Sequence, residues 1–402
     1  MIRIGLLKEG KIPPDNRVAL TPAQCRWLLK NKKEIQVFAQ SSPHRCFTDK
    51  EYIAAGVEVC NSLEHCDILL GIKEVPAAEI LSNKTYLFFS HTCKKQPHNQ
   101  KMLQTILQKK ATLIDYECLR HDDGQRIIGF GFFAGIVGAH NGIMAYGYKT
   151  KTFELGRVYE QKDFRNLIRT YFGLKLPNIK IAVTGSGRVA QGIVEIMNLM
   201  GVIEVEKEEF RERDFQYPVY VHLKGSDLYR NKLTGSYQRD EFHNEPQKYE
   251  CLFRDYLSAT DILMNGIYWD SGIPRLFDKE DVSKPEFRIS VIADITDDCN
   301  GSVPINYGDQ SIADPVYGVD RFSLEKTTPY QDETIDVMAV GNLPNELPRD
   351  ASRYFGEQLL KYVLQELMWD QSKLIEKATI VKNGQLTPAY AYLHDYAHGE
   401  ID

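Results

Sequence analysis

The sequence lacks three features that would assign it to a special class of protein. It has no apolar run near the about 18 residues that a membrane-spanning helix needs, no C-x-x-C pair, and no excess of positive charge. Its formal net charge is −6 over 402 residues. Nucleic acid is therefore a poor main partner, because phosphate binding needs a basic face. We expect neither a membrane nor a nucleic acid as a partner.

The eight cysteines are scattered along the chain and suggest no disulfide framework. We expect no metal, and reduced thiols of the kind found in the cytoplasm. Cys93 lies within a motif described below and is a candidate reactive thiol, although a buried structural cysteine is the favoured interpretation. The first residues show no apolar segment before a small-residue cleavage site, so we expect no signal peptide.

The composition is that of a globular protein of two or three domains, with 43% hydrophobic and 26% charged residues. The first 135 or so residues alternate short strand candidates with helical stretches, which predicts βαβ units on a parallel sheet. A small-residue-rich apolar segment at 131–147 predicts a helix packed closely between the domains. The strand candidates are 3–7, 36–39, 68–72, 86–89 and 112–114, and later 181–184, 261–265 and 289–294.

We predict an α/β fold of two Rossmann-like domains with parallel sheets flanking a cleft. Residues 1–135 plus 345–402 would form the substrate and catalytic domain, and residues 136–344 the dinucleotide-binding domain. Apolar residues recur at helical spacing over 354–368, so the C-terminal segment is expected to return to the first domain.

The most informative motif is the glycine-rich turn at 183–192 (VTGSGRVAQG), between a strand candidate and a helix-patterned segment. In that setting backbone N–H groups and a helix N-terminus face a dinucleotide pyrophosphate. Gly185 would make the tight turn, Gly187 would admit the phosphate, and Ala190 would allow close helix–strand packing. The expected cofactor-binding turn also includes Ser186, Arg188 and Val189.

An acidic residue about 20 positions after the first glycine would bond the ribose 2′-hydroxyl and favour NAD. Glu206 is the candidate and Glu204 the alternate, whereas Lys207 would suit the 2′-phosphate of NADP. The alternative is that all three belong to a solvated charge run. The polar stretch 206–250 that follows is either a lid or a peripheral insertion, and the insertion is favoured.

Basic residues follow several strand candidates of the first domain. Arg17 precedes the first helix, Lys73 and Glu74 follow one strand, and His91 and Lys94 follow another. Ligands of an open parallel sheet bind beyond the carboxyl ends of its strands, so we expect these side chains to converge. Taken singly, each residue has a structural interpretation as a solvated cation or a hydrogen-bonded histidine.

With these motifs the chain resembles the lysine–2-oxoglutarate reductase half of the bifunctional α-aminoadipic semialdehyde synthases. It is similar, less closely, to the monofunctional lysine-forming saccharopine dehydrogenases, within the alanine dehydrogenase and transhydrogenase superfamily. At 402 residues we expect the monofunctional type. The stretches that carry the resemblance are 17–22 (RVALTP), 71–76 (GIKEVP), 84–94 (KTYLFFSHTCK), 113–117 (LIDYE), 126–131 (RIIGFG), 264–269 (MNGIYW), 292–296 (IADIT) and 341–348 (GNLPNELP).

The resemblance implies a reversible reductive amination that joins lysine and 2-oxoglutarate into saccharopine. Lys73 would handle the amine proton and His91 the carbinolamine and imine steps. Glu74 and Glu117 would tune the pKa of Lys73, since negative charge raises it and burial lowers it. The expected substrate-binding residues are Arg17, Lys94 and Arg126, and further cofactor-binding residues are Ile267, Tyr268 and Asp294. The cofactor would be NAD or NADP: the reductase family leans towards NADP, while Glu206 favours NAD, which is preferred.

One position departs from the family pattern. These families carry an aspartate beside the substrate, immediately before the Asn-Leu-Pro element, and this sequence has Gly341 there. Two alternatives stay open, an alanine dehydrogenase-like enzyme with a smaller substrate and a non-catalytic nucleotide-binding module. The expected partners are the small molecules lysine, 2-oxoglutarate and saccharopine, with the chain a monomer or small homo-oligomer.

Overall fold

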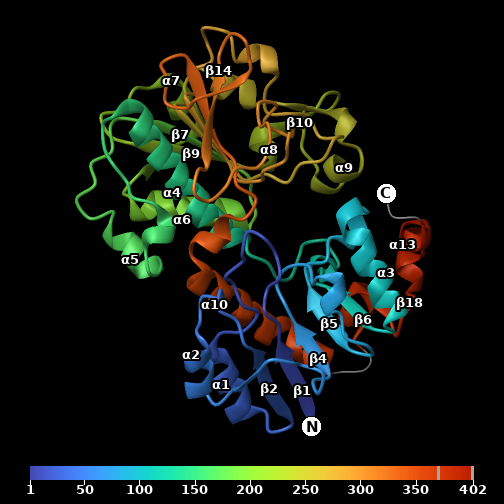
Figure 1. Ribbon diagram of the computed structural model, residues 1–402. Helices are drawn as coiled ribbons and strands as arrows, with labels where there is room; N and C mark the ends of the chain where they lie inside the picture. The colour runs from blue at the N-terminus through green and yellow to red at the C-terminus, as the bar shows by residue number, and fades with distance from the viewer. Residues whose placement is uncertain (369–371, 400–402) are drawn as a thin grey trace. The chain divides into compact units, whose positions relative to one another are not determined.

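The computed structural model describes residues 1–368 and 372–399. The chain forms two compact units (Figure 1): unit 1 contains Met1–Phe130 and Pro348–Asp402, and unit 2 contains Gly131–Leu347. Each unit is built on one eight-stranded, mostly parallel sheet. The predicted α/β class with two Rossmann-like sheets, and the return of the C-terminal segment to the first one, are confirmed.

The sheet of unit 1 reverses its strand order next to its first strand. β1 (Ile2–Leu6) is followed on one side by β2 (Ile35–Gln40) and β3 (Glu58–Cys60), and on the other side by β4 (Ile68–Leu70), β5 (Thr85–Phe88) and β6 (Thr112–Asp115). These six strands are parallel. Beside β6 lies β17 (Thr379–Lys382), which is antiparallel to it, and β18 (Gln385–Leu386) pairs antiparallel with β17 at the edge of the sheet. Such a reversal leaves a crevice at the carboxyl ends of the strands.

The helices of unit 1 begin where the sequence provides caps. Thr21 caps the first one, α1 (Pro22–Asn31), through a reciprocal pair of hydrogen bonds with Gln24, and Pro22 occupies its first position. The amphipathic stretch predicted at 354–368 begins earlier, in α10 (Pro348–Gln358), and passes through a π-helical turn (Leu359–Val363) into α11 (Leu364–Leu367). The other helices are α2 (Asp49–Ala54), α3 (Gln100–Gln108), α12 (Lys373–Ala378) and α13 (His394–His398).

The sheet of unit 2 reverses between β7 (Lys180–Thr184) and β12 (Ile262–Asn265). Beyond β12 follow the parallel strands β13 (Val291–Asp294) and β16 (Thr334–Met338), then the antiparallel β14 (Val316–Asp320) and β15 (Lys326–Thr327). On the other side of β7 lie β9 (Val219–Leu223) and the edge strand β8 (Ile203–Glu204). Buried side chains of β9, β12, β13, β14 and β16 share one hydrophobic core.

The sequence favours a peripheral insertion for the polar stretch 206–250, and the structure shows otherwise. The stretch contains β9, which lies between β7 and β8 in the main sheet. The surrounding charged residues obscure a strand whose Val219, Tyr220, Val221 and Leu223 are buried. The rest of the stretch forms α7 (Lys207–Glu212), α8 (Gly225–Leu228), α9 (Arg239–Asn244) and a separate pair of strands, β10 (Tyr229–Asn231) and β11 (Tyr249–Cys251).

The predicted small-residue helix is α4 (Gly131–Thr150), and it packs against α6 (Arg188–Leu199) and β13 within unit 2. Glycines allow the two helix backbones to approach closely. A Cβ on Gly135 would lie 2.0 Å from the carbonyl oxygen of Val189, and a Cβ on Gly192 would lie 2.1 Å from that of Phe132. α4 thus supports the first turn of α6. The remaining helix of unit 2 is α5 (Phe164–Arg169).

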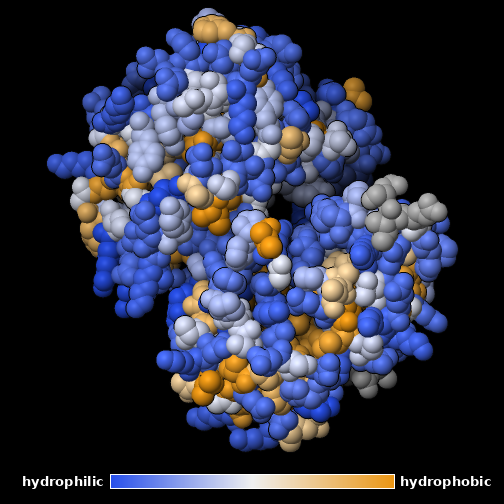
Figure 2. All heavy atoms as spheres, in the orientation of Figure 1, coloured by the Kyte–Doolittle hydropathy of each residue, from blue (hydrophilic) through white to orange (hydrophobic). Residues whose placement is uncertain are grey.

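On the face seen in Figure 2, both units carry mainly hydrophilic side chains, with apolar ones in small groups. Among residues 1–368 and 372–399, no helix combines the length and the apolar character that a bilayer crossing requires.

We expect Gly135→Ala to destabilise unit 2 by about 1–3 kcal/mol, because the added methyl group meets backbone atoms that cannot rotate away. The measurement is the unfolding midpoint in urea, followed by circular dichroism. Gly156→Ala is the control, since the nearest heavy atom to its added methyl group, a carboxylate oxygen of Glu160, lies 3.5 Å away. Equal midpoints for the two variants would contradict the close helix packing.

Candidate active site

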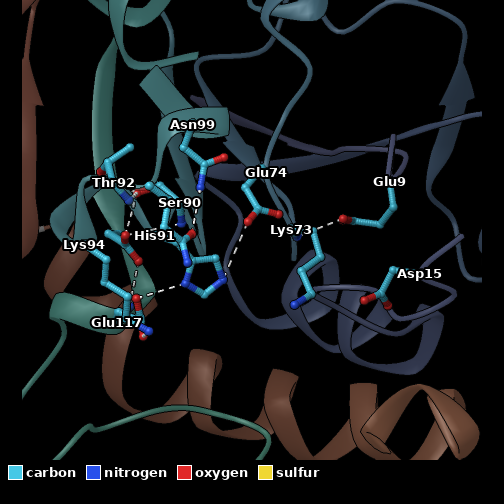
Figure 3. Close-up of polar contacts among 12 residues, drawn as sticks. Glu9, Asp15, Lys73, Glu74, Ser90, His91, Thr92, Lys94, Asn99 and Glu117 are labelled. Atoms are coloured by element: carbon cyan, nitrogen blue, oxygen red, sulfur yellow. Dashed lines mark hydrogen bonds and ion pairs between the residues drawn. The ribbon is translucent and has the colours of Figure 1, made fainter. Parts of the chain in front are cut away.

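Polar side chains gather where three neighbouring strands of unit 1 end. Lys73 and Glu74 follow β4, His91 and Lys94 follow β5, and Glu117 follows β6. The strands are parallel and adjacent, so their carboxyl ends lie along one edge of the sheet (Figure 3). The predicted convergence at this edge forms two neighbouring groups, one around Glu117 and one around Lys73.

Glu117 is the centre of the first group. Its Oε2 lies 3.1 Å from His91 Nδ1, its Oε1 lies 3.5 Å from Lys94 Nζ, and Arg126 forms an ion pair with the same Oε1. Burial raises the pKa of this carboxyl, but the hydrogen bond with His91 and the charge of Arg126 outweigh it and bring the pKa to about 2. The carboxylate is therefore ionised at neutral pH.

Asp115, the last residue of β6, fixes the two turns that carry this group. Its Oδ2 accepts hydrogen bonds from the backbone N–H of Ser90 (3.2 Å) and the hydroxyl of Ser90 (2.5 Å), and its Oδ1 accepts one from the backbone N–H of Glu117 (2.8 Å). His91 follows with left-handed backbone angles, φ 53° and ψ 14°. A non-glycine residue in this conformation costs about 1–3 kcal/mol and persists only where its surroundings hold it.

Lys73 belongs to the second group. The carboxyl group of Glu9 accepts hydrogen bonds from the backbone N–H groups of Ile72 (2.7 Å) and Lys73 (2.8 Å), which hold the end of β4 in place. Burial lowers the pKa of the Lys73 amine to about 8, and the positive charges of Arg17 and Lys11 add to the shift. A substantial fraction of this amine is neutral near physiological pH.

Arg17 is held beside Lys73 by Asp15. Its Nη2 lies 2.5 Å from Asp15 Oδ2, its guanidinium lies 4.2 Å from the centre of the Phe130 ring, and Arg17 is only 4% exposed. Burial raises the pKa of Asp15, but the charge and hydrogen bonds of Arg17 outweigh it and bring the pKa to about 2. Figure 3 shows Asp15 and Glu9 on the Lys73 side of the cluster.

The structure corrects one expected pairing. Glu117 was expected to tune Lys73, but it contacts His91, Lys94 and Arg126 instead. Glu74 has two neighbours: its Oε1 lies 3.7 Å from His91 Nε2, and its charge raises the pKa of Lys73 as a lesser influence.

Sequence reasoning missed Glu9 and Asp15. Both follow β1, so the rule that drew attention to the basic residues at strand ends would also have found these acids.

The glycine turn of unit 2 has the geometry of a phosphate cradle. Gly185 has φ 109°, and a Cβ there would lie 2.5 Å from the carbonyl oxygen of Gly266, which excludes any other residue. Gly187 precedes the first turn of α6, and no heavy atom lies within 4 Å of the Cβ it lacks. The residues present therefore fit a dinucleotide pyrophosphate beside the N-terminus of α6.

A cavity of about 400 Å³ lies at the ends of β8 and β9, lined by Glu204, Val205, Glu206, Lys207, Val221, His222, Lys224 and Asp227. Glu206, 21 positions after Gly185, directly precedes α7, and the strand next to β7 is β9. Glu206 still lines the cavity with Glu204, which accepts a hydrogen bond from Tyr220 (3.1 Å). Lys207 Nζ is held by Asp227 at 2.5 Å.

The other expected cofactor residues differ in exposure. Asp294 is fully buried, and its carboxylate accepts amide hydrogen bonds from Asn265 and Asn306, each at 2.8 Å. Ile267 is buried, whereas Tyr268 is 71% exposed. Asp294 therefore holds the side chains of Asn265 and Asn306 in place at the ends of the strands.

Gly341 lies between two carboxylates. Its backbone N–H donates to Asp309 Oδ1 at 2.6 Å, and a Cβ on Gly341 would lie 3.0 Å from Asp297 Oδ2 and 3.1 Å from Asp309 Oδ2. Burial, together with the charges of Asp309 and Asp294, raises the pKa of Asp297 to about 8.

Residues 5–137 match the family described as alanine dehydrogenase/PNT, N-terminal domain. The chain is 29% identical to the mitochondrial α-aminoadipic semialdehyde synthase of Mus musculus, over 97% of this chain and 47% of that protein. It is 28% identical to the saccharopine dehydrogenase [NAD(+), L-lysine-forming] of Emericella nidulans, over 90% of this chain and 92% of that protein. This chain and the saccharopine dehydrogenases are homologues.

The saccharopine dehydrogenase homologue from Yarrowia lipolytica is 25% identical and covers 96% of this chain, so the relationship extends over both units. The chain spans about half the length of the synthases that it matches. Among solved structures, an L-alanine dehydrogenase superposes over 98% of this chain with a TM-score of 0.63 at 16% identity. At that identity the likeness shows the fold alone, and it agrees with the two sheets described above.

We expect Lys73 to titrate near pH 8, and Arg17→Gln to raise its pKa, because that change removes a positive charge that disfavours the ammonium form. The measurement is competitive acetylation across the pH range, read by mass spectrometry, with the exposed Lys101 as internal reference. A Lys73 midpoint that does not move in the Arg17 variant would contradict the electrostatic coupling.

Proposed function

We propose that this chain is an oxidoreductase that interconverts saccharopine with L-lysine and 2-oxoglutarate, using a nicotinamide cofactor. One observation carries the proposal: a lysine of lowered pKa and a histidine flanked by two carboxylates lie at adjacent strand ends of a chain homologous to saccharopine dehydrogenases. Condensing an amine with a ketone needs a base for the amine and an acid for the departing water.

Lys73 would take the proton of the incoming amine. An amine must be neutral to attack a carbonyl carbon, and the ε-amine of free lysine is protonated at neutral pH. A base with a pKa of about 8 accepts that proton and can later return it. Lys11 and Arg17 keep the Lys73 pKa low, and Glu9 holds its backbone.

His91 would exchange protons at the carbinolamine oxygen. Glu117 is ionised, so it accepts the hydrogen bond from His91 Nδ1 and fixes the proton on that nitrogen. Nε2 is then the nitrogen that accepts or donates a proton. Glu74, 3.7 Å from Nε2, would stabilise the imidazolium that forms. Loss of water from the carbinolamine yields the imine between the two substrates.

Cations would bind the three carboxylates of saccharopine. Lys94 and Arg126 have half-exposed side chains, at 56% and 43%, and both reach the cluster through Glu117. Arg17 is buried with Asp15, so we propose that it orients one carboxylate from within the wall of the site.

Unit 2 would bind the cofactor, and unit 1 the substrates, in line with the expected division into 136–344 and 1–135 plus 345–402. The turn from Gly185 to Ala190 would hold the pyrophosphate, and Glu204 and Glu206 the adenosine ribose, which favours NAD. When bound, the nicotinamide supplies or accepts the hydride. We further propose a cytoplasmic monomer or small homo-oligomer, consistent with eight free cysteines.

An alanine dehydrogenase-like activity is the second candidate, because the alanine dehydrogenase fold covers nearly the whole chain. A single experiment separates the two: oxidation of the reduced nicotinamide, followed by absorbance, with lysine plus 2-oxoglutarate and then with ammonia plus pyruvate. We expect turnover with the first mixture. Turnover with the second mixture alone would overturn the proposal, and silence in both with cofactor binding intact would favour a non-catalytic nucleotide-binding module.

We expect Lys73→Met and His91→Gln each to lower kcat by about 10²–10⁴, the usual contribution of a positioned acid or base. Steady-state kinetics with lysine and 2-oxoglutarate test this. Lys101→Met, at an exposed lysine on α3, is the matched control and should keep wild-type activity. Full activity in the Lys73 variant would refute its assigned role.

Cofactor choice is tested at the cavity beside β8. We expect Glu204→Gln combined with Glu206→Gln to lower the ratio of kcat/KM for NAD over NADP by about tenfold, which equals about 1.4 kcal/mol or one charge-assisted hydrogen bond. Glu208→Gln on α7 lies outside the cavity lining and is the control. An unchanged ratio would remove both acids from ribose recognition.

A further inference from the structure

Two cysteines meet directly beneath the acid–base cluster. Cys93 lies between His91 and Lys94 in the short 3-10 turn Thr92–Lys94, and Cys118 follows Glu117 in the turn Tyr116–Cys118. Their Sγ atoms are 3.4 Å apart, although the residues are 25 positions apart in the chain. Both cysteines are partly exposed residues.

We propose that Cys93 and Cys118 are a redox modification site, whose reversible disulfide joins the two turns that carry His91, Lys94 and Glu117. A disulfide needs an S–S distance of about 2.0 Å, so closure draws the sulfur atoms together by about 1.4 Å. Side-chain rotation absorbs part of that movement, and the rest comes from the two turns, whose spacing is held by the Asp115 carboxylate. The disulfide therefore shifts His91 relative to Glu117.

The chemistry balances with a peroxide as oxidant. A Cys118 thiolate attacks one peroxide oxygen, the O–O bond breaks, and Cys118 becomes a sulfenic acid, while the other oxygen takes up the proton that the Cys118 thiol had released and leaves as water. Cys93 then attacks that sulfur, the S–O bond breaks, and a second water leaves with the remaining thiol proton. The two sulfurs lose two electrons in total, and a dithiol reductant restores both thiols.

The surroundings favour Cys118 as the attacking sulfur. The hydrogen bond from the Cys93 thiol lowers the pKa of Cys118, whereas the same contact and burial raise the pKa of Cys93. A metal would need Asp115 as its third ligand, since one of its carboxylate oxygens and the two sulfurs lie within 4.8 Å of one another. Asp115 already accepts three hydrogen bonds, so the arrangement favours a disulfide between the two cysteines over a bound metal.

The test is limited oxidation of the full chain with hydrogen peroxide, followed by thiol counting and peptide mass spectrometry. We expect two of the eight thiols to be lost first, with a Cys93–Cys118 cross-linked peptide that dithiothreitol removes. Cys93→Ser and Cys118→Ser should each abolish the cross-link, and Cys299→Ser, at an exposed cysteine, should keep it. Oxidation of other thiols first, or a bound zinc ion that is lost in both variants and protects the pair, would overturn the proposal.

The effect on turnover rests on the proposed function and is read separately. We expect the cross-linked protein to lose at least tenfold in kcat with lysine and 2-oxoglutarate, because displacements of about 1 Å in a catalytic site cost up to 10²-fold. Dithiothreitol should restore the rate, and Cys93→Ser should be insensitive to peroxide. An unchanged rate in the cross-linked protein would refute the shift of His91. If the reduced protein is inactive, the proposed function fails while the peptide map still decides the disulfide.

Discussion

The acid–base cluster depends on one buried carboxylate, that of Asp115. It receives three hydrogen bonds from the chain segments that leave β5 and β6, and so sets the distance between the two turns. Burial raises the pKa of this carboxyl above its usual value, and the hydrogen bonds from Ser90 and Glu117 offset only part of that rise. The left-handed conformation of His91 is held by the same anchor.

The electrostatic surroundings of Glu117 and Lys73 give these two groups different roles in the cluster. Glu117 is surrounded by His91, Lys94 and Arg126, so its charge is fixed and it can hold one imidazole nitrogen in a single protonation state. Lys73 is buried beside the cations Arg17 and Lys11, so its charge is easily lost. A fixed anion after β6 and a labile cation after β4, with His91 after β5 between them, are the arrangement that acid–base chemistry needs.

The sequence was sufficient for the part of this site that follows from strand adjacency. Lys73, His91 and Lys94 each follow a strand, and parallel neighbours bring such positions to one edge. The sequence was not sufficient to predict which side chains pair within the site, because packing decides which of them turn towards each other. Glu117 binds His91 rather than tuning the pKa of Lys73. Spacing also singled out Glu206, which lines the cavity beside β8, but residue counting does not contain the sheet order that puts β9 between β7 and β8.

Gly341 has a physical explanation in its neighbours. The Cβ of any side chain at this position would lie 3.0 Å and 3.1 Å from two carboxylate oxygens, which is closer than ordinary van der Waals contact. An aspartate there would bring a further negative charge next to Asp297 and Asp309. Burial and the charges of Asp309 and Asp294 already raise the pKa of Asp297 to about 8. Like charges this close together disfavour one another's ionisation. Glycine at 341 is therefore the residue that this acidic surrounding accommodates, and the carboxyl groups at this end of β16 are those of Asp309 and Asp297 instead.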